Sequence, residues 1–532
     1  MTAARRIQAG QPGDRGISVE IGGVGALHAS PCPLRPIRPT IGGVRRSTRV
    51  VAVAGAAGLL AACTSTPEGP RPGPTASALQ TTPSPATPSS TPSPRVTTPL
   101  VLAVNPTRNV VDVPVASARA FSVDGATNWS ALGQASGPLR IVAAGVGPTA
   151  GGPAAQRLAS TAEALDAVRA DPATIALVPA QAMDPTVRAL TVGGVHPLRS
   201  PTTYPLEAEA TATLGEPVTM TIVGDIMLGR RVGEAMAAVG DLAAPLRPLA
   251  ERLASADVTV GNLESTLSRD GSPTQGGDSF AADPGVAAGL QLAGFDVLSL
   301  ANNHVGDWGD AALVQTVEAV RAMGIEPVGA GATLAEARSP VMVERGGTSI
   351  GVIGTESIGE SPAAGTDQPG TNRLNMPPRT GPLDQAALDR IVADIAALDP
   401  LVDVVVVIPH WGTQYTNLPE PGQRAVAEAF AQAGADLVAG GHPHWVQGWE
   451  MVGPTPVVHS LGNFVFDMDF MRETQEGVFL EIVIVDGRVA AVEPVPYVIG
   501  DDFAPRLATP DQAAPILALM RETSQPPFGP GG

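Results

Sequence analysis

Residues 436–448, "DLVAGGHPHWVQG", place two histidines directly after a short apolar run. The run is typical of a buried β-strand, and the two glycines mark the end of that strand. Because alternate side chains of an extended backbone point to the same side, we expect His442 and His444 to face one direction across Pro443. Two imidazoles in this arrangement either bind a metal together or crowd each other. The rest of the sequence decides between these two interpretations.

The same arrangement, an apolar strand followed by polar residues, recurs between residues 217 and 500. Helical patterns separate many of these strands, for example at residues 310–324 and 422–435. Strands that alternate with helices predict an α/β fold. Ligands in such sheets collect at the carboxyl ends of strands, which is where the polar residues fall. These polar residues are Asp225, Asn262, Glu264, Asn302, Asn303, His304, Asp307, His410, His442, His444, His459 and Asn463.

Each of these polar clusters has an ordinary structural explanation when it is taken alone. Asp225 could cap a helix, Asn302 could belong to a turn, and His410 could be a hydrogen-bonded core histidine. Taken together, the clusters indicate a shared metal site, because five of the seven histidines of the chain occur here, all at predicted strand ends. Carboxylates, a carboxamide and three imidazoles form a ligand set suited to two divalent transition metals. Two such ions about 3.5–4 Å apart can hold the attacking and leaving oxygens of a phosphoryl displacement.

Six ordered motifs in residues 217–500 carry a resemblance to a known family. They are "GDIMLGR", "NLES", "ANNHVGDWG", "HWGTQY", "GGHPHWVQG" and "HSLGNFVFD". In order and spacing they resemble the CapA/PgsA family of capsule (poly-γ-glutamate) synthesis proteins, whose domain is similar to the calcineurin-like metallophosphoesterases. The resemblance implies a layered α/β/β/α sandwich with a dinuclear metal site, and a part in capsule synthesis.

Carried over by position, the resemblance implies the ligands of two divalent metal ions, which would be Mn, Fe or Zn. The ligands of the first ion would be Asp225 and His444. Those of the second ion would be Asn303, His410 and His442. Glu264 would bridge the ions, and the additional site residues would be Asn262, His459 and Asn463.

The resemblance also implies a proton donor, and it leaves two functions open. His304 would protonate the leaving group while Asp307 orients its ring, which favours a metal-dependent hydrolase that acts on a phosphoester. The alternative is a non-catalytic capsule-assembly or polymer-anchoring component that keeps the fold. Met227 favours this alternative, because it stands where the phosphoesterase pattern has a histidine ligand. The bridging aspartate of that pattern is replaced here by Glu264.

The N-terminal region carries a secretory signal. Three arginines precede the apolar run "VVAVAGAAGLLAAC" at residues 50–63, which is too short to span a bilayer as a stable helix. Its end, Leu60 to Cys63, resembles the lipobox of bacterial lipoproteins, which implies cleavage before Cys63 and a lipid on the sulfur. The other explanation is a chance cysteine after an ordinary signal. We expect a signal peptide over 44–63 and an extracytoplasmic protein anchored by its lipid to the cytoplasmic membrane.

Four further segments complete the predicted organisation. Residues 1–43 precede the signal as an upstream extension that translation need not include. Residues 64–98 are rich in Pro, Ser and Thr and predict a disordered tether. Residues 99–210 predict a small α/β domain that resembles half of a phosphate-type solute-binding protein; it either binds a small anion and regulates its neighbour or is a spacer without a ligand. Residues 501–532 are expected to form a C-terminal tail.

Composition narrows the classes of protein to which the chain can belong. The 532 residues carry a net charge of −18 and contain no lysine, which argues against a general nucleic-acid binder. The two cysteines, Cys32 and Cys63, exclude a disulfide scaffold and a cysteine-based zinc site. The partners are implied by the resemblances instead: the lipobox-like Cys63 implies the membrane, reached through the lipid, and the likeness to the CapA/PgsA family implies the machinery of capsule-polymer synthesis.

Overall fold

The computed structural model describes residues 96–109, 112–210 and 212–530. The predicted upstream extension, the signal peptide with Cys63 and most of the predicted tether lie outside these residues. Strand β1 (Val96–Val104) begins inside the last residues that we assigned to the tether, so that segment ends earlier than expected. Within the described ranges, no helix combines the length and the apolar character needed to cross a membrane.

The first part of the described chain is built on one mixed sheet. Its strand order is β4-β3-β5-β1-β6, with β8 paired to β1. The bounds of its strands are β1 (Val96–Val104), β3 (Arg140–Ala143), β4 (Ala155–Arg157), β5 (Thr174–Pro179), β6 (Arg188–Ala189) and β8 (Glu207–Ala210). Helix α1 spans Val115–Asp124, and α2 (Thr161–Ala170) begins after Ser160, whose side chain accepts from the Glu163 amide. This part therefore contains both helices and strands, as expected for a small α/β domain.

The larger part begins with an eight-stranded sheet. Its order is β14-β13-β10-β9-β24-β25-β26, and β23 pairs with β9. Strands β14, β13, β10 and β9 run parallel, as crossover connections require, whereas β24 and β25 form an antiparallel hairpin. The bounds are β9 (Val218–Ile226), β10 (Val258–Leu263), β13 (Val297–Ser299), β14 (Glu326–Val328), β23 (Asn463–Val465), β24 (Glu476–Val485), β25 (Arg488–Ile499) and β26 (Pro505–Leu507).

A second sheet of six strands has the order β16-β17-β19-β20-β22-β21. Its strands β17, β19, β20 and β22 are parallel neighbours. The bounds are β16 (Val341–Arg345), β17 (Thr348–Glu356), β19 (Val404–His410), β20 (Leu437–Ala439), β21 (Trp449–Val452) and β22 (Thr455–Val458). The parallel strands of both sheets end where the sequence places its polar clusters.

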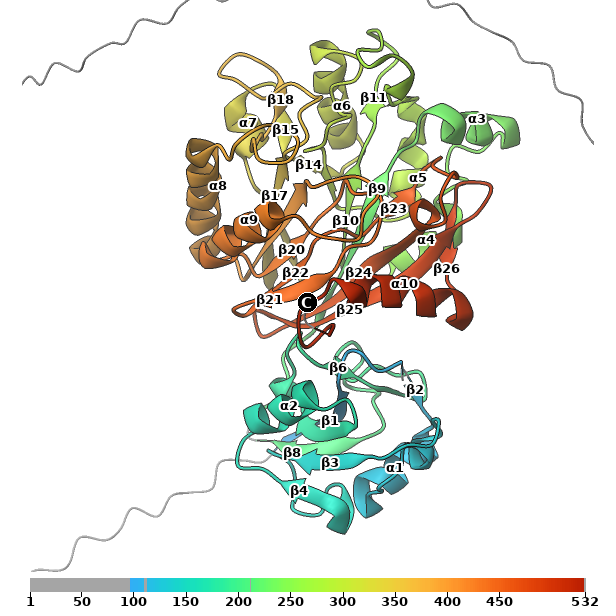
Figure 1. Cartoon of the computed structure of the whole chain (residues 1–532), viewed down its shortest axis with the longest axis vertical. Helices are drawn as coiled ribbons and strands as arrows, with labels where there is room; N and C mark the ends of the chain where they lie inside the picture. The colour runs from blue at the N-terminus through green and yellow to red at the C-terminus, as the bar shows by residue number, and fades with distance from the viewer. Residues whose placement is uncertain (1–95, 110–111, 211, 531–532) are drawn as a thin grey trace, which may run out of the picture. The chain divides into compact units, whose positions relative to one another are not determined.

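The two sheets pack face to face, and helices cover their outer faces (Figure 1). Strand β19 shows how the sequence produces these layers. Val404 and Val406 lie in the core between the sheets, whereas Val405 and Val407 pack against α8 (Gln385–Leu398) and α9 (Pro421–Gln432). Because both faces are covered, the strand is apolar at consecutive positions.

On the other side, α3 (Arg230–Val239), α4 (Arg247–Ala254), α5 (Ala287–Leu292) and α6 (Asp310–Ala322) cover the larger sheet. The order of layers is therefore helices, sheet, sheet, helices. This arrangement confirms the predicted α/β/β/α sandwich.

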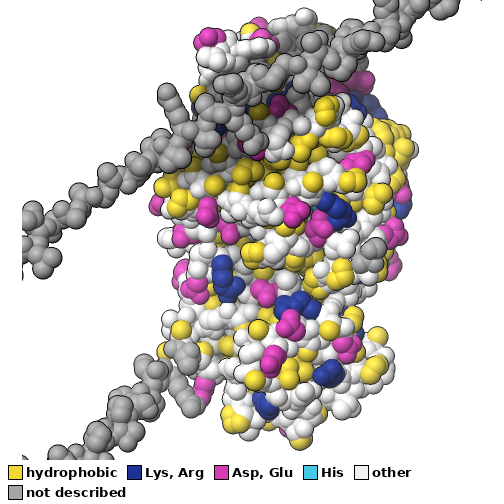
Figure 2. Space-filling view, turned by 60° about the vertical axis from the view of Figure 1, so that its left-hand side comes forward, with side chains coloured by type: hydrophobic (Ala, Val, Ile, Leu, Met, Phe, Trp, Pro, Cys, Tyr) yellow, Lys and Arg dark blue, Asp and Glu magenta, His cyan; other side chains and the backbone are white. Residues whose placement is uncertain are grey.

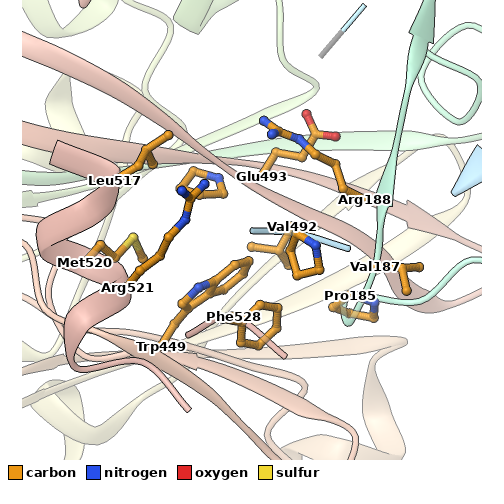
Figure 3. Close-up of a pocket in the computed structure, with 12 residues that line it drawn as sticks. Pro185, Val187, Arg188, Trp449, Val492, Glu493, Leu517, Met520, Arg521 and Phe528 are labelled. Carbon is orange, nitrogen blue, oxygen red and sulfur yellow. The ribbon is translucent and has the colours of Figure 1, made fainter. Parts of the chain in front are cut away.

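The C-terminal residues belong to this domain, although we expected a tail over 501–532. Strand β26 extends the larger sheet, and α10 (Pro510–Glu522) begins with a capping box at Thr509. Figure 3 shows Met520 and Phe528 beside Trp449, and the Phe528 ring stacks on the Trp449 ring at a centroid distance of 3.5 Å. The segment therefore extends the predicted domain of residues 217–500.

Candidate metal centre

The carboxyl ends of strands from both sheets meet at one place. Asp225 is the last residue but one of strand β9, and Glu264 follows the neighbouring β10. From the second sheet, β19 ends with His410, whose Nε2 lies 3.5 Å from Oε1 of Glu264. After β20, His444 places Nδ1 3.8 Å from Oδ2 of Asp225. Side chains that are far apart in the sequence therefore form one cluster between the sheets.

Two groups within this cluster have the spacing of metal ligands. The first consists of Glu264, His410 and His442, and the second of Asp225, Glu264 and His444. In each group, one ligand atom per residue lies within 4.8 Å of the others. All of these side chains are buried, and Glu264 belongs to both groups. The cluster thus offers buried carboxylates and imidazoles that could hold a metal ion.

Two members of the cluster have side-chain atoms that find no hydrogen-bond partner among the residues that the structure describes. Both carboxylate oxygens of Glu264 and both ring nitrogens of His442 are buried in this state. Leaving a buried polar atom unpaired costs roughly 1–3 kcal/mol, and more for a charged group, so such atoms call for an explanation. A metal ion bound to these oxygens and nitrogens supplies one, and the residues present fit it.

The protonation of the cluster also suits metal binding. Burial raises the pKa of Asp225 to about 7, with a further rise from Glu264, and burial raises the pKa of Glu264 to about 8. Burial lowers the pKa of His444 to about 3, and it lowers the pKa values of His410 and His442 in the same direction. The imidazoles are therefore neutral, which is the form that binds metals. The carboxylates need a compensating positive charge, which a dication provides.

Carboxamides surround the ligand groups and orient them. Asn262 donates to Oδ1 of Asp225 at 2.8 Å, and Asn302 donates to Oδ1 of Asn262 at 3.0 Å. Oδ1 of Asn303 lies 2.8 Å from Nε2 of His410, and Oδ1 of Asn463 lies 2.8 Å from Nδ1 of His444. The structure therefore brings all four predicted asparagines to the cluster.

The His-Pro-His segment does not have the extended backbone that we expected. His442 and His444 have φ values of 93° and 59°, in the left-handed region that costs a non-glycine residue about 1–3 kcal/mol. Gly441 allows this path, because a Cβ there would lie 2.4 Å from Oδ1 of Asp225. The amide of His442 donates to Oδ2 of the same carboxylate at 3.0 Å. The two rings still lie near each other, with centroids 5.6 Å apart, but in different ligand groups.

His304 stands at the edge of the cluster. Its Nδ1 lies 2.7 Å from Oδ2 of Asp307, and its Nε2 lies 3.8 Å from Oε1 of Glu264. Asp307 is itself held, since the Phe280 amide donates to Oδ2 at 2.7 Å and the Gln275 side chain donates to Oδ1. The Phe280 ring stacks on the imidazole at a centroid distance of 3.6 Å. The ring is therefore fixed with Nε2 directed at the ligands.

Two sequence positions lie apart from this arrangement. His459 was expected to be an additional site residue, but its Nε2 lies 2.7 Å from Oε1 of Glu450 and its carbonyl accepts from the Trp411 indole. Met227, which stands where a histidine ligand is expected, packs in the apolar core and accepts from the Gly229 amide. Position 227 therefore contributes no ligand.

Sequence reasoning missed Arg230, Gln275 and Phe280, which support His304 and its surroundings. Arg230 lies within the quoted motif "GDIMLGR", but a single arginine carries no pattern of its own. Phe280 and Gln275 come from an irregular segment, and only the tertiary fold brings them to the site.

Other surfaces and hollows differ from this cluster in composition. Acidic and basic side chains alternate with apolar ones over the face shown in Figure 2. The hollow of Figure 3 contains about 30 Å³, enough for a water molecule, and shares no residue with the ligand groups.

Comparisons with known proteins agree on one family. Residues 219–468 match the family described as "Bacterial capsule synthesis protein PGA_cap". The capsule biosynthesis protein CapA of Bacillus anthracis is 33% identical over 321 residues, which are 58% of this chain and 74% of that protein. The PGA biosynthesis protein CapA of Bacillus subtilis (strain 168) is 30% identical over 258 residues, which are 47% of this chain and 64% of that protein.

Among solved structures, a hypothetical protein from Thermus thermophilus is similar at 18% identity and a TM-score of 0.33, over 53% of this chain and 99% of that one. The family match covers the residues that form the cluster of carboxylates and imidazoles. The chain belongs to the CapA family of bacterial capsule synthesis proteins.

Proposed function

We propose that the chain is an extracytoplasmic hydrolase of the capsule synthesis family that uses two divalent metal ions to cleave a phosphoester. The observation that carries this proposal is the position of Glu264. Its two carboxylate oxygens are buried and have no hydrogen-bond partner within residues 96–109, 112–210 and 212–530, and the side chain belongs to both ligand groups. A carboxylate in this position can bridge two cations, because it offers two oxygens and a compensating negative charge.

The proposal assigns the remaining residues by their distances. Asp225 and His444 would hold one ion. His410 and His442 would hold the other ion, together with Oδ1 of Asn303, which lies beside His410. When bound, the ions supply Lewis-acid chemistry and offset the charge of the phosphoryl group. Mn, Fe and Zn all suit the mixture of carboxylate and imidazole ligands.

His304 is suited to proton transfer by its position and by its partner. Asp307 accepts from Nδ1–H, which leaves Nε2 to carry the second proton toward the ligands. A proton at this nitrogen can pass to the oxygen that leaves when the ester bond breaks. The stack on Phe280 keeps the ring in this orientation.

A second candidate function is a non-catalytic component of capsule-polymer assembly. The packing of Met227 in the core favours it, because no imidazole from position 227 reaches the site. Since CapA of Bacillus subtilis is described as a PGA biosynthesis protein, we propose a poly-γ-glutamate capsule as the polymer in either case. Metal analysis combined with a phosphodiesterase assay distinguishes the two functions.

Replacement of Glu264 by glutamine should empty the site. The carboxamide keeps the shape of the side chain but removes the charge that both ions share, so the loss in metal affinity should exceed the roughly 10–100-fold that is typical of residues that only orient ligands. Elemental analysis after dialysis measures it. His459→Gln is the matched control, a buried histidine outside both ligand groups, and should retain metal. Normal metal content in Glu264→Gln would contradict the bridging role.

Replacement of His304 by glutamine should slow turnover and leave the metal in place. General-acid assistance contributes about 10²–10⁴-fold, so kcat for an alkyl phosphodiester should fall by that order. Esters with good leaving groups should lose less, because they need less protonation. Loss of metal in this variant would identify His304 as a ligand. Unchanged hydrolysis in the variants of both Glu264 and His304 would leave the assembly component as the function.

Metal binding should strengthen as the pH rises. Without metal, the raised pKa values of about 7 and 8 keep Asp225 and Glu264 protonated below those pH values, and an ion must displace the protons. The lowered histidine pKa values add no proton in this range. Titration of the metal-free protein with Mn²⁺ should show an affinity that falls about tenfold per pH unit from pH 8 to 7, and more steeply below 7. A flat profile would show that these carboxyls are ionised before metal arrives.

We propose a lipid anchor at Cys63 from the sequence alone, through which the protein is held at the membrane beside the polymer machinery. Cys63→Ser should abolish lipid attachment, so the protein should leave the membrane fraction or stall as an unprocessed precursor. Cell fractionation and intact-mass measurement test this. Cys32→Ser, which changes the other cysteine of the chain, is the control and should behave like the wild type. A Cys63→Ser protein with wild-type mass and location would exclude the anchor.

A further inference from the structure

Backbone strain gathers at the metal centre. Within the described residues, six non-glycine positions have positive φ, and four of them are at or beside the ligand groups: Arg230, Tyr415, His442 and His444. Each such position costs about 1–3 kcal/mol and persists only where the surroundings enforce it. His442 and His444 are members of the ligand groups, and the Tyr415 ring stacks on His444 at 6.0 Å. Arg230, with a φ of 44°, has no role in the mechanism above.

The guanidinium of Arg230 is held in a fixed position. Asp467 accepts from its Nε at 3.1 Å and also from its Nη2. The guanidinium lies 4.3 Å over the ring of Phe280, which in turn stacks on His304. Guanidinium, phenyl ring and imidazole thus form one column, and His304 at its end is 3.8 Å from Glu264. A long side chain that normally moves freely is fixed here beside the reacting groups.

The charge of Arg230 acts on the metal centre. The Arg230 guanidinium lies over the ring of Phe280, this ring stacks on His304, and Nε2 of His304 is 3.8 Å from Oε1 of Glu264. A positive charge beside two cations would repel them and would weaken metal binding if it had no other use. Asp467 balances the charge of Arg230, and a negative group that contacts both the guanidinium and the cations would give this positive charge a use at the site.

Arg230 also has unused hydrogen-bond donors. Asp467 takes the edge of the guanidinium formed by Nε and Nη2, and Nη1 has no hydrogen-bond partner in the part of the chain that the structure describes. The side chain is 25% exposed, so a ligand can reach it, whereas Asp467 is almost completely buried. Arginine is suited to oxyanions because its planar fork places several N–H groups toward them.

The neighbouring Arg231 shows that an arginine at the start of this helix can form an ion pair without pointing toward the metal centre. It lies on the same helix, pairs with Asp469 and packs over an aromatic ring, that of Phe503. Its side chain is 52% exposed, and its φ is not in the left-handed region. Arg231 therefore provides a comparison for an arginine of the same helix that pairs with an aspartate and packs on an aromatic ring, but is more exposed and lacks the left-handed φ.

We propose that Arg230 is a substrate-binding residue that holds a second negatively charged oxygen group, next to the bond at the metal centre. The substrate is then a polyanion in which a phosphate or a carboxylate lies beside the cleaved bond. The proposal rests on the proposed function for the location of that bond. It adds a specificity that metal ligands alone do not supply, because a neutral neighbour of the same bond would lose the contact with Arg230.

The test compares Arg230→Gln with Arg231→Gln in the full chain loaded with Mn²⁺. Inorganic phosphate and γ-glutamylglutamate are titrated separately by calorimetry, and KM and kcat are measured with O-phosphoserine, which carries a carboxylate near its phosphoester. A charge-assisted hydrogen bond lost on a buried site corresponds to roughly 10–100-fold in affinity. We expect that loss for Arg230→Gln with at least one probe, in KM more than in kcat, and none for Arg231→Gln. The probe that loses affinity identifies the oxyanion as phosphate or carboxylate.

Three results would overturn the proposal: unchanged affinity for both probes in Arg230→Gln, an equal loss in Arg231→Gln, or a lower kcat with unchanged affinity. The last result would mean that Arg230 only positions Phe280 and His304. If the single variant does not fold, Arg230→Gln combined with Asp467→Asn removes both charges and leaves no buried carboxylate unpaired. We expect the same loss of affinity in this double variant, and the same three results would overturn the proposal.

The experiment separates this proposal from the proposed function. A wild-type protein that holds metal and binds a probe through Arg230 but has no turnover would overturn hydrolysis and leave Arg230 as an anion-binding residue. Turnover with normal probe affinity in Arg230→Gln would support hydrolysis and overturn the role of Arg230. A wild-type protein that binds neither probe would overturn the role of Arg230 as well.

Discussion

Two carboxylates buried side by side, Asp225 and Glu264, impose the constraint on which the rest of the site depends. Neither is exposed to solvent, and their mutual repulsion adds to the cost of removing them from water. Neither sheet alone surrounds them, because Asp225 lies near the end of a strand of one sheet and His410 ends a strand of the other. The face-to-face packing of the sheets therefore creates the burial and brings neutral imidazoles to the same place, where a dication can compensate the charge of the carboxylates.

The same packing enforces the strained path of the His-Pro-His segment. Asp225 accepts from the His442 amide, and the Pro443 carbonyl accepts from the Tyr415 amide at 2.9 Å. Gly441 leaves room for the carboxylate where any side chain would collide with it. The packing of the surrounding core offsets the conformational free energy that this strained backbone costs. As a result, the ligands are held in place before an ion binds, so that they lose little conformational freedom on binding.

The layers of the fold could be predicted from the sequence, because strands buried on both faces leave apolar runs that end abruptly. The run before His410 is an example, since alternate valines serve two different cores. The ligand residues could also be located, because the polar residues that follow such runs gather at one edge. The local conformation at His442 could not, because it results from tertiary contacts with Asp225, 217 residues away in the sequence.

Residues that support the ligands leave little trace in the sequence. Phe280 lies under His304 but follows an irregular stretch with no periodicity. His459 is a residue that we wrongly predicted to belong to the site. It follows a strand as the ligands do, yet its ring pairs with Glu450 across the β21–β22 hairpin. A strand end predicts that a side chain lies near the edge of a sheet, but not the direction in which it points.

The contacts of α10 have a consequence for the order in which the site is completed. The Thr523 hydroxyl accepts from the Gly448 amide and the Ser524 hydroxyl accepts from the Trp449 amide, both at 3.0 Å, directly behind the His-Pro-His segment. In a chain synthesised from its N-terminus, these hydroxyls are made after every candidate metal ligand. Ribosome-bound or truncated chains that end before Thr523 contain all of those ligands but lack the groups that fix one end of their loop. Tension applied to the chain directly after Ser524 is therefore transmitted to the segment that carries His442 and His444.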